Sequence, residues 1–352
     1  MKKSASSHSR LKVGKIPHAL LERLLAKNQL SDPRVIIGPR LGEDAAAVAF
    51  GNRLVLAATD PITFATDLIG WYVVHVNAND IAVMGARPKW FLCSALFPEG
   101  VSAAEVEHFF DQTIQACRSL GISLIGGHAE VTAGLGRTIA IGTMLGEVSK
   151  AGVVSSAGAM AADDIILAGE IAVEGTSLLA REFGDRLRAA GAAEADLEAA
   201  RGLLLEPGIS VVKAARLACS LAKPHAMHDP TEGGLATGLL ELALASGVGL
   251  EVGEEAIPIL PLCRAFCRRL RLRPLGLIAS GSLLIAASAQ DSPRITGALN
   301  RAGLAAAVIG QVKPSAAGVK IIRRGKAYDL PRFARDEIAR LTGDSLSVAR
   351  CS

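Results

Sequence analysis

A long apolar segment, residues 67–84, carries three polar side chains in its interior. The apolar residues of this segment predict one buried helix. Within it lie Asn77, Asn79 and Asp80. Asn and Asp compete with the backbone for hydrogen bonds and destabilise a helix interior. A buried carboxylate must also be paired, protonated or bound to a metal ion, because an isolated buried charge is very costly. The three residues together therefore favour a functional site on this helix.

Two further acidic positions precede this helix in the chain. Glu43-Asp44 and Asp60 each border a short apolar run that predicts a strand. Taken alone, the acidic pair after Gly42 is typical of a surface turn, and an Asp before proline is typical of a turn or cap. Together with Asp80, however, these carboxylates come from three neighbouring elements. They predict a site for a hard cation, where oxygen ligands hold magnesium against substrate phosphates.

The composition argues against several other classes of function. Half of the 352 residues are hydrophobic and 20% are charged, as in a soluble globular protein with room for two domains. Aromatic residues make up only 4%, too few for the stacking platforms of a single-strand nucleic-acid binder, and the net charge of +4 is scattered. The longest apolar run falls short of the ~18 residues of a membrane span. The six cysteines lack paired CxxC spacing and predict free thiols. We expect a cytoplasmic protein without a nucleic-acid or membrane partner.

The order of predicted strands and helices divides the chain into two similar halves. We expect a disordered tail over 1–12, an N-terminal domain over 13–150, a linker over 151–163, a C-terminal domain over 164–325 and a tail over 326–352. Strands interrupted by single helices, without strict alternation, predict an α+β fold with antiparallel or mixed sheets covered by helices.

Local signals fix two of the expected elements. Gly51-Asn52 separates two apolar runs and predicts a β-hairpin with a turn of mirror type. Ser102 followed by Glu105 forms the pattern of a capping box and predicts the start of a helix, which Gly121 ends.

Two glycine pairs predict further contacts with a ligand. A predicted strand over 122–125 runs into Gly126-Gly127, a polar turn that can bring the backbone close to a phosphate. His128, which follows, suits a ligand or a proton carrier, although a lone histidine is more often a hydrogen-bonded structural group. Glu130 is the better candidate to join the cation.

The second glycine pair stands directly before an apolar helix, in the segment 228–234. Here Thr231 is the natural N-cap, and Gly233-Gly234 expose the N–H groups of the first turn, which bind anions. The plainer alternative is a cap that only starts a helix. Two glycines in a first turn cost about 1 kcal/mol each, which favours close approach to a ligand.

Together these clusters resemble the aminoimidazole ribonucleotide (AIR) synthase superfamily, over roughly residues 12–320. The resemblance rests, in chain order, on Gly42-Glu43-Asp44-Ala45-Ala46, Thr59-Asp60, Val76-Asn77-Ala78-Asn79-Asp80-Ile81-Ala82-Val83-Met84-Gly85-Ala86-Arg87-Pro88, Gly126-Gly127-His128-Ala129-Glu130 and Asp229-Pro230-Thr231-Glu232-Gly233-Gly234-Leu235. It implies two α/β domains, N-terminal sheets that dimerise into a barrel, and activation of an oxygen by ATP with magnesium.

The resemblance also implies roles for individual residues. Asp44, Asp60 and Asp80 would hold Mg²⁺, with Glu130 as a fourth ligand. The other residues expected around ATP are Asn77 and Asn79, which would orient nucleotide or water, the backbone at Gly126 and Gly127, and Asp229, Thr231, Gly233 and Gly234 at the phosphates. The expected catalytic residues are His128, Glu130 and Cys351.

Within the superfamily the chain is most similar to the hydrogenase-maturation carbamoyl dehydratase, whose terminal cysteine carries the carbamoyl group that ATP dehydrates. Three departures stand out. Cys351 is penultimate and the terminal Pro-Arg-Ile-Cys motif is lost, His128 replaces an aspartate, and Glu232 replaces an arginine.

The resemblance thus implies ATP- and magnesium-dependent activation of a carbonyl or phosphate oxygen by a homodimer. It further implies a small-molecule or protein-bound carbamoyl acceptor and a maturation-factor partner. Two alternatives stay open. One is a small-molecule kinase or ligase of the AIR synthase or thiamine-monophosphate kinase type. The other is a nucleotide-binding paralogue without turnover that acts as a partner or regulator.

Overall fold

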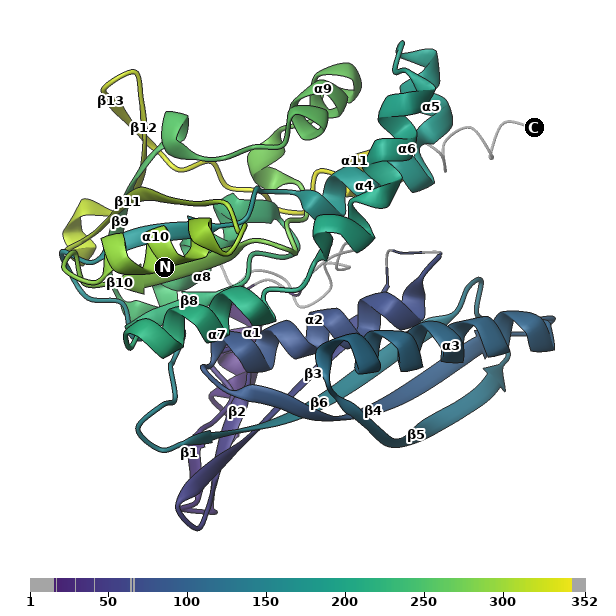
Figure 1. Ribbon diagram of the computed structural model, residues 1–352, viewed down its shortest axis with the longest axis horizontal. Helices are drawn as coiled ribbons and strands as arrows, with labels where there is room; N and C mark the ends of the chain where they lie inside the picture. Colours follow the sequence, from purple (N-terminus) through teal and green to yellow (C-terminus); the bar gives the residue numbers. More distant parts are fainter. Residues whose placement is uncertain are drawn as a thin grey trace, which may run out of the picture.

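The computed structural model describes residues 16, 18–28, 30–40, 42–63, 65 and 67–343. Two α/β halves follow one another along the chain, and each is built on a sheet of its own (Figure 1). The predicted α+β fold is confirmed. The predicted tail over 1–12 and Cys351 lie outside the described residues.

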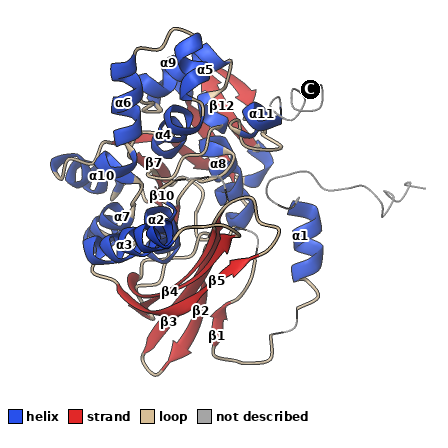
Figure 2. Ribbon diagram, turned by 90° about the vertical axis from the view of Figure 1, so that its right-hand side faces the viewer, coloured by secondary structure: helices blue, strands red, loops and turns tan. Residues whose placement is uncertain are grey.

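The N-terminal half is a six-stranded sheet with two long helices on one face (Figure 2). Its strands are ordered β1-β2-β3-β6-β4-β5, and all neighbours are antiparallel except β4 and β5. The elements are α1 (His18–Leu25), β1 (Val35–Ile37), β2 (Ala46–Phe50), β3 (Arg53–Ile62), α2 (Ile69–Val83), β4 (Arg87–Pro98), α3 (Ala103–Leu120), β5 (Ser123–Thr132) and β6 (Ile139–Ser149).

Both local predictions in this half are confirmed. Strands β2 and β3 pair as a hairpin around Gly51-Asn52, and Gly51 takes the positive φ of 59° that a mirror-type turn requires. Helix α3 begins with a capping box between Ser102 and Glu105, and it ends at Gly121 in the left-handed conformation.

Helix α2 lies in the middle of the molecule and is buried on nearly all sides. It contacts β3, β4 and β6 on the sheet, α3 beside it, and α7 of the C-terminal half. Two glycines of β6 allow it to approach the sheet. A Cβ on Gly142 would lie 2.3 Å from the Asn77 side chain, and one on Gly146 would lie 2.3 Å from Ile81. The polar residues of α2 are therefore held at fixed positions between the two halves.

The C-terminal half is a seven-stranded mixed sheet ordered β13-β12-β9-β11-β7-β10-β8, with helices packed against it. Its strands are β7 (Asp164–Ala168), β8 (Ala226–His228), β9 (Gly249–Gly253), β10 (Leu283–Ala287), β11 (Ala306–Lys313), β12 (Val319–Arg323) and β13 (Lys326–Asp329). Its α-helices are α4 (Val173–Glu182), α5 (Gly184–Ala189), α6 (Glu194–Gly202), α7 (Val212–Leu221), α8 (Gly234–Ser246), α9 (Pro261–Leu270), α10 (Ser292–Arg301) and α11 (Ala339–Gly343). Residues 326–343, predicted as part of a tail, thus include the edge strand β13 and α11.

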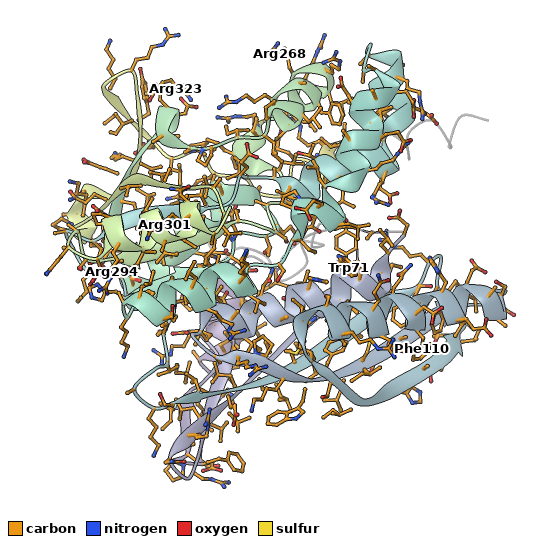
Figure 3. All side chains as sticks on the ribbon, viewed as in Figure 1. Trp71, Phe110, Arg268, Arg294, Arg301 and Arg323 are labelled. Carbon is orange, nitrogen blue, oxygen red and sulfur yellow. The ribbon has the colours of Figure 1, made fainter. Side chains whose placement is uncertain are left out.

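Asn79 joins the two halves through its side chain. Its amide nitrogen donates to the Ile209 carbonyl, and its oxygen accepts from the Val211 amide, both at 2.9 Å. All these groups are buried, so the amide of α2 supplies the hydrogen bonds that the turn before α7 would otherwise lack. On the same helix Trp71 lies toward the C-terminal half (Figure 3).

Charge on the C-terminal half is dispersed over its outer elements. Arg268 lies on α9, Arg294 and Arg301 lie on α10, and Arg323 lies on β12, all along the rim of this half (Figure 3). They do not form one basic face. In the described part of the chain, no helix combines the length and the apolarity that crossing a membrane would need.

One predicted turn is wrong. The strand predicted over 122–125 does not stop at Gly126-Gly127 but continues as β5 to Thr132. The register of β5 against β4 shifts at this point, and a Cβ on Gly127 would lie only 2.0 Å from the Cys93 carbonyl oxygen. The glycines therefore allow the backbones of β4 and β5 to approach closely where the pairing of the two strands is irregular.

Candidate cation and phosphate site

A cavity of about 440 Å³ lies between the two halves. The N-terminal half contributes the loop before β2, the strand β3 and the helix α2, and the C-terminal half contributes the end of β8 and α8. The lining residues are Ile16, Leu21, Arg40, Gly42, Glu43, Asp44, Thr59, Asp60, Asp80, His228, Asp229, Thr231, Glu241 and Leu244. The three aspartates predicted to hold magnesium thus line one cavity.

Asp60 is placed by the buried amide of Asn77. The Asn77 oxygen accepts from the Asp60 backbone N–H at 2.9 Å, and its nitrogen donates to the Asp60 carbonyl at 3.2 Å and to the Val73 carbonyl at 2.8 Å. Asn77 therefore fixes the backbone of β3 where the carboxylate of Asp60 enters the cavity. Its amide atoms are engaged with the backbone, so Asn77 has a positioning role in the structure.

Asp44 sits where the loop before β2 meets the C-terminal half. Gly42, with a positive φ of 80°, lets this loop lie against α8, because a Cβ there would be 2.8 Å from Ala245. The Asp44 carboxylate accepts from the Ser156 hydroxyl at 2.7 Å and lies 3.1 Å from His228 Nδ1. Two residues from distant parts of the chain, Ser156 and His228, therefore orient it.

Asp80 and Asp229 add two buried carboxylates to the same cavity. Burial, followed by the negative charges of Asp60, Asp229 and Asp44, raises the pKa of Asp80 well above its usual value. Burial and the charge of Asp44 do the same to the pKa of Asp229. So many carboxylates in one buried space repel one another, and a cation among them would relieve the repulsion.

Two carboxylate oxygens on the wall of this cavity, Glu43 Oε2 and Asp229 Oδ2, are buried without a hydrogen-bond partner among the described residues. Asp229 is 2% exposed, and its Oδ2 has no hydrogen-bond partner among the described residues. Buried polar atoms are almost always satisfied, so such an atom calls for an explanation. The carboxylate-rich cavity and this atom both fit a bound divalent cation, for which oxygen donors are the usual ligands.

His228 and Glu241 belong to the cluster but were not predicted as site residues. His228 is buried, and its Nε2 lies 3.1 Å from Glu241 Oε2 on α8. Burial lowers the pKa of His228, but the charges and hydrogen bonds of Asp44 and Glu241 outweigh this and raise it well above its usual value. Glu241 is an acidic residue in the apolar run of α8, the same signal that singled out Asp80 on α2.

The start of α8 differs from the prediction. Thr231 is not the N-cap, because Gly233 occupies that position in the left-handed conformation and no side chain caps the helix. The N–H of Gly233 is also not free, since it donates to the carboxylate of Asp336 at 2.8 Å. Burial raises the pKa of Asp336 to about 7. The carboxylate of Asp336 therefore accepts a hydrogen bond from one of the N–H groups that were predicted to bind phosphate.

The structure does not bring His128 and Glu130 to this cavity within one chain. Both are exposed on β5, where His128 Nε2 and Glu130 Oε2 lie 3.0 Å apart. In the sheet order β3-β6-β4-β5, the strand β5 stands three positions from the strand of Asp60. Strand spacing makes this a separation of roughly 14 Å. Gly126 and Gly127 lie on the same edge strand.

Comparisons with known proteins agree with this architecture. Residues 42–148 match the model of the AIR synthase related protein, N-terminal domain, and residues 161–322 match its C-terminal domain. The carbamoyl dehydratase HypE of Cupriavidus necator is 33% identical over 272 residues, which cover 74% of this chain and 73% of that protein.

Two solved structures share the fold. The first is a HypE-HypF complex, with a TM-score of 0.74 and 21% identity, covering 90% of this chain and 100% of the other. The second is a hydrogenase maturation protein HypE in complex with ATP, with a TM-score of 0.69 and 24% identity, covering 84% and 90%. The chain therefore belongs to the family of AIR synthase-related proteins, and within this family it is similar to the HypE carbamoyl dehydratases.

Proposed function

We propose that this protein is an ATP- and magnesium-dependent enzyme that activates a carbonyl oxygen, as in the carbamoyl dehydratase reaction of hydrogenase maturation. The observation that carries the proposal is the cavity between the two halves, where carboxylates from four separate segments face one another. The relatives support the choice of reaction, because they are carbamoyl dehydratases and one of their structures holds ATP.

Asp60, Asp80 and Asp44 are the residues that would hold Mg²⁺, and Asp229 would reach the same cation or a second one. Bound MgATP would supply the phosphoryl group that turns a carbonyl oxygen into a leaving group. The chain contributes positioning and charge, which are the main catalytic devices in phosphoryl transfer. Asn77 fixes Asp60, and Ser156 with His228 fixes Asp44.

The same relatives support a proposal for the acceptor and for the partner. We propose a carbamoyl-type acceptor, either a small molecule or a group carried by a protein, and a maturation-factor partner of the kind seen in the HypE-HypF complex. Cys351 lies outside the described residues, and its role as carrier stays a prediction. The described cysteines are free thiols, which fits the cytoplasm as the proposed compartment.

Titration calorimetry of the full chain with ATP tests the proposal. We expect binding in the presence of Mg²⁺, and a loss of more than about tenfold in affinity, or about 1.4 kcal/mol, without the metal ion or in Asp60→Asn. This variant should fold, because Asn77 bonds to the backbone of Asp60 rather than to its side chain. Asp185→Asn, at an exposed position, is the control and should bind as the wild type does. Equal affinity of Asp60→Asn and wild type would contradict the proposed role of the cavity.

We also propose a homodimer formed through the N-terminal sheets. The edge strand β5 is exposed along nearly its whole length, and Ile125 and Val131 on it are 53% and 60% exposed. Long exposed edge strands with apolar side chains pair readily with another strand. In a dimer of this kind, His128 and Glu130 on β5 would lie close to the second chain.

Replacing Ile125 with lysine is expected to convert the dimer into a monomer, because a charge would be buried in the strand-to-strand contact. Light scattering coupled to size-exclusion chromatography measures the mass. Leu205→Lys is the matched control, since Leu205 is also 53% exposed but lies in the C-terminal half. A dimer that survives Ile125→Lys, or a wild type that is already monomeric, would place β5 outside any such interface.

A further inference from the structure

The cavity contains a nitrogen donor among its carboxylates. One ligand atom each from Asp44, His228 and Asp229 can be chosen so that all three lie within 4.8 Å of one another. His228 and Asp229 are buried, and Asp44 is half-buried. Three donors at such distances can bind one metal ion, and the set is mixed, with one imidazole nitrogen and two carboxylates.

The two ring nitrogens of His228 face different partners. Nε2 lies 3.1 Å from Glu241 Oε2, and Nδ1 lies 3.1 and 3.2 Å from the two oxygens of Asp44. A histidine that binds a metal ion usually donates its other ring N–H to a carboxylate, which fixes the tautomer and the ring orientation. Glu241 is placed to accept that proton from Nε2. When a cation displaces the proton that Nδ1 directs at Asp44 in the metal-free protein, the lone pair of Nδ1 points into the cavity.

An independent observation points to a ligand at the same place. The Oδ2 atom of Asp229 is buried and lacks a hydrogen-bond partner among the residues that the structure describes. Asp229 follows His228 directly in the chain and lines the same cavity. A cation held by Nδ1 and Asp44 would also satisfy this oxygen.

We propose that His228 is a direct ligand, through Nδ1, of the divalent cation in this cavity, and that Glu241 orients its ring. The inference rests on the proposed cation site and adds a nitrogen ligand to it. Magnesium binds almost only oxygen ligands, whereas a first-row transition-metal ion such as Mn²⁺ accepts an imidazole nitrogen as well as carboxylate oxygens. The site should therefore bind Mn²⁺ more tightly than Mg²⁺, and His228 should be the source of the difference.

Electron spin-echo envelope modulation of Mn²⁺ bound to the full chain, without nucleotide, tests the proposal. The wild type is expected to give nitrogen modulation from a coordinated imidazole. In His228→Gln this modulation should vanish, and the preference for Mn²⁺ over Mg²⁺ should fall by about tenfold. Glu241→Gln should keep the nitrogen signal but weaken Mn²⁺ binding by about tenfold, because the ring loses its orienting partner.

His225→Gln is the matched control. Its ring also bonds to an aspartate, Asp163, at 2.8 Å, but it does not line the cavity. This variant should keep both the nitrogen signal and the affinity for Mn²⁺. The wild-type spectrum alone decides the question if a variant fails to fold.

Bound Mn²⁺ without nitrogen modulation, or modulation that persists in His228→Gln, would overturn the proposal. The measurement distinguishes a failure of the His228 proposal from a failure of the proposed function. MgATP binding without a nitrogen signal leaves the function standing and removes His228 as a ligand. A nitrogen signal without any binding of ATP leaves the metal site standing and removes the proposed function. A chain that binds neither Mn²⁺ nor MgATP contradicts both.

Discussion

Replacing Asp80 with asparagine is expected to stabilise the metal-free protein and to abolish its stabilisation by divalent cations. Asp80 is buried, and burial together with the charges of Asp60, Asp229 and Asp44 raises its pKa. The negative charge is thus a cost to the metal-free fold. Asparagine has nearly the same shape and can keep the hydrogen bond to Asp60. We expect a gain of about 2 kcal/mol in the free energy of unfolding.

Urea unfolding in EDTA and in excess Mn²⁺ or Mg²⁺ measures both effects. The wild type should gain about 2.7 kcal/mol when the cation stands at a hundred times its Kd, because the ion binds only the folded state. Asp80→Asn should show almost none of this gain. A variant that is less stable than the wild type in EDTA, or that still responds to the cation, would contradict the assignment of Asp80.

Asp163→Asn is the control for a buried aspartate outside the cavity. Asp163 is 3% exposed, but it accepts hydrogen bonds from His225 and from the Met160 N–H. Its charge is therefore compensated within the protein. The substitution should lower stability in EDTA, by about 2 kcal/mol, and leave the response to cations intact.

Much of the fold could be predicted from the sequence, because its signals are local. The hairpin at Gly51-Asn52 depends on a turn that only a few residue types adopt, and the start of α3 depends on two side chains three residues apart. The meeting of Asp44, Asp60 and Asp80 was predictable for a related reason. Each aspartate borders or interrupts an apolar element, and such elements pack together in the core.

The remaining parts of the site depend on contacts between distant segments. The sequence around His228 shows a histidine before an aspartate, but only the folded chain brings Asp44 and Glu241 to opposite sides of its ring. The sequence likewise predicts that the N–H of Gly233 is a free donor. In the structure this N–H donates to the carboxylate of Asp336, 103 residues away. Pairing with β4 similarly turns Gly127 from a predicted turn residue into a strand residue.

The two asparagines of α2 also could not be assigned separate roles from the sequence, because they belong to one motif but bond to different parts of the protein. Asn77 bonds to the strand that carries Asp60, within the N-terminal half. Asn79 bonds to Ile209 and Val211 of the C-terminal half. Successive residues of a helix point in different directions, about 100° apart, so one short motif can position a ligand, join two halves and line a cavity.

Replacing Asn79 with alanine is therefore expected to destabilise the protein by about 3 kcal/mol. The change leaves the carbonyl of Ile209 and the N–H of Val211 buried without partners, and each such group costs about 1–3 kcal/mol. Urea unfolding measures the loss, and amide hydrogen exchange at Val211 should accelerate because its hydrogen bond is gone.

Asn300→Ala is the matched control. Asn300 makes the same pair of backbone hydrogen bonds, both to Ala306 at 2.9 Å, but on the surface. Water can replace those bonds, so Asn300→Ala should cost less than about 1 kcal/mol. Equal losses in the two variants would mean that burial at the junction of the two halves adds nothing to the role of Asn79.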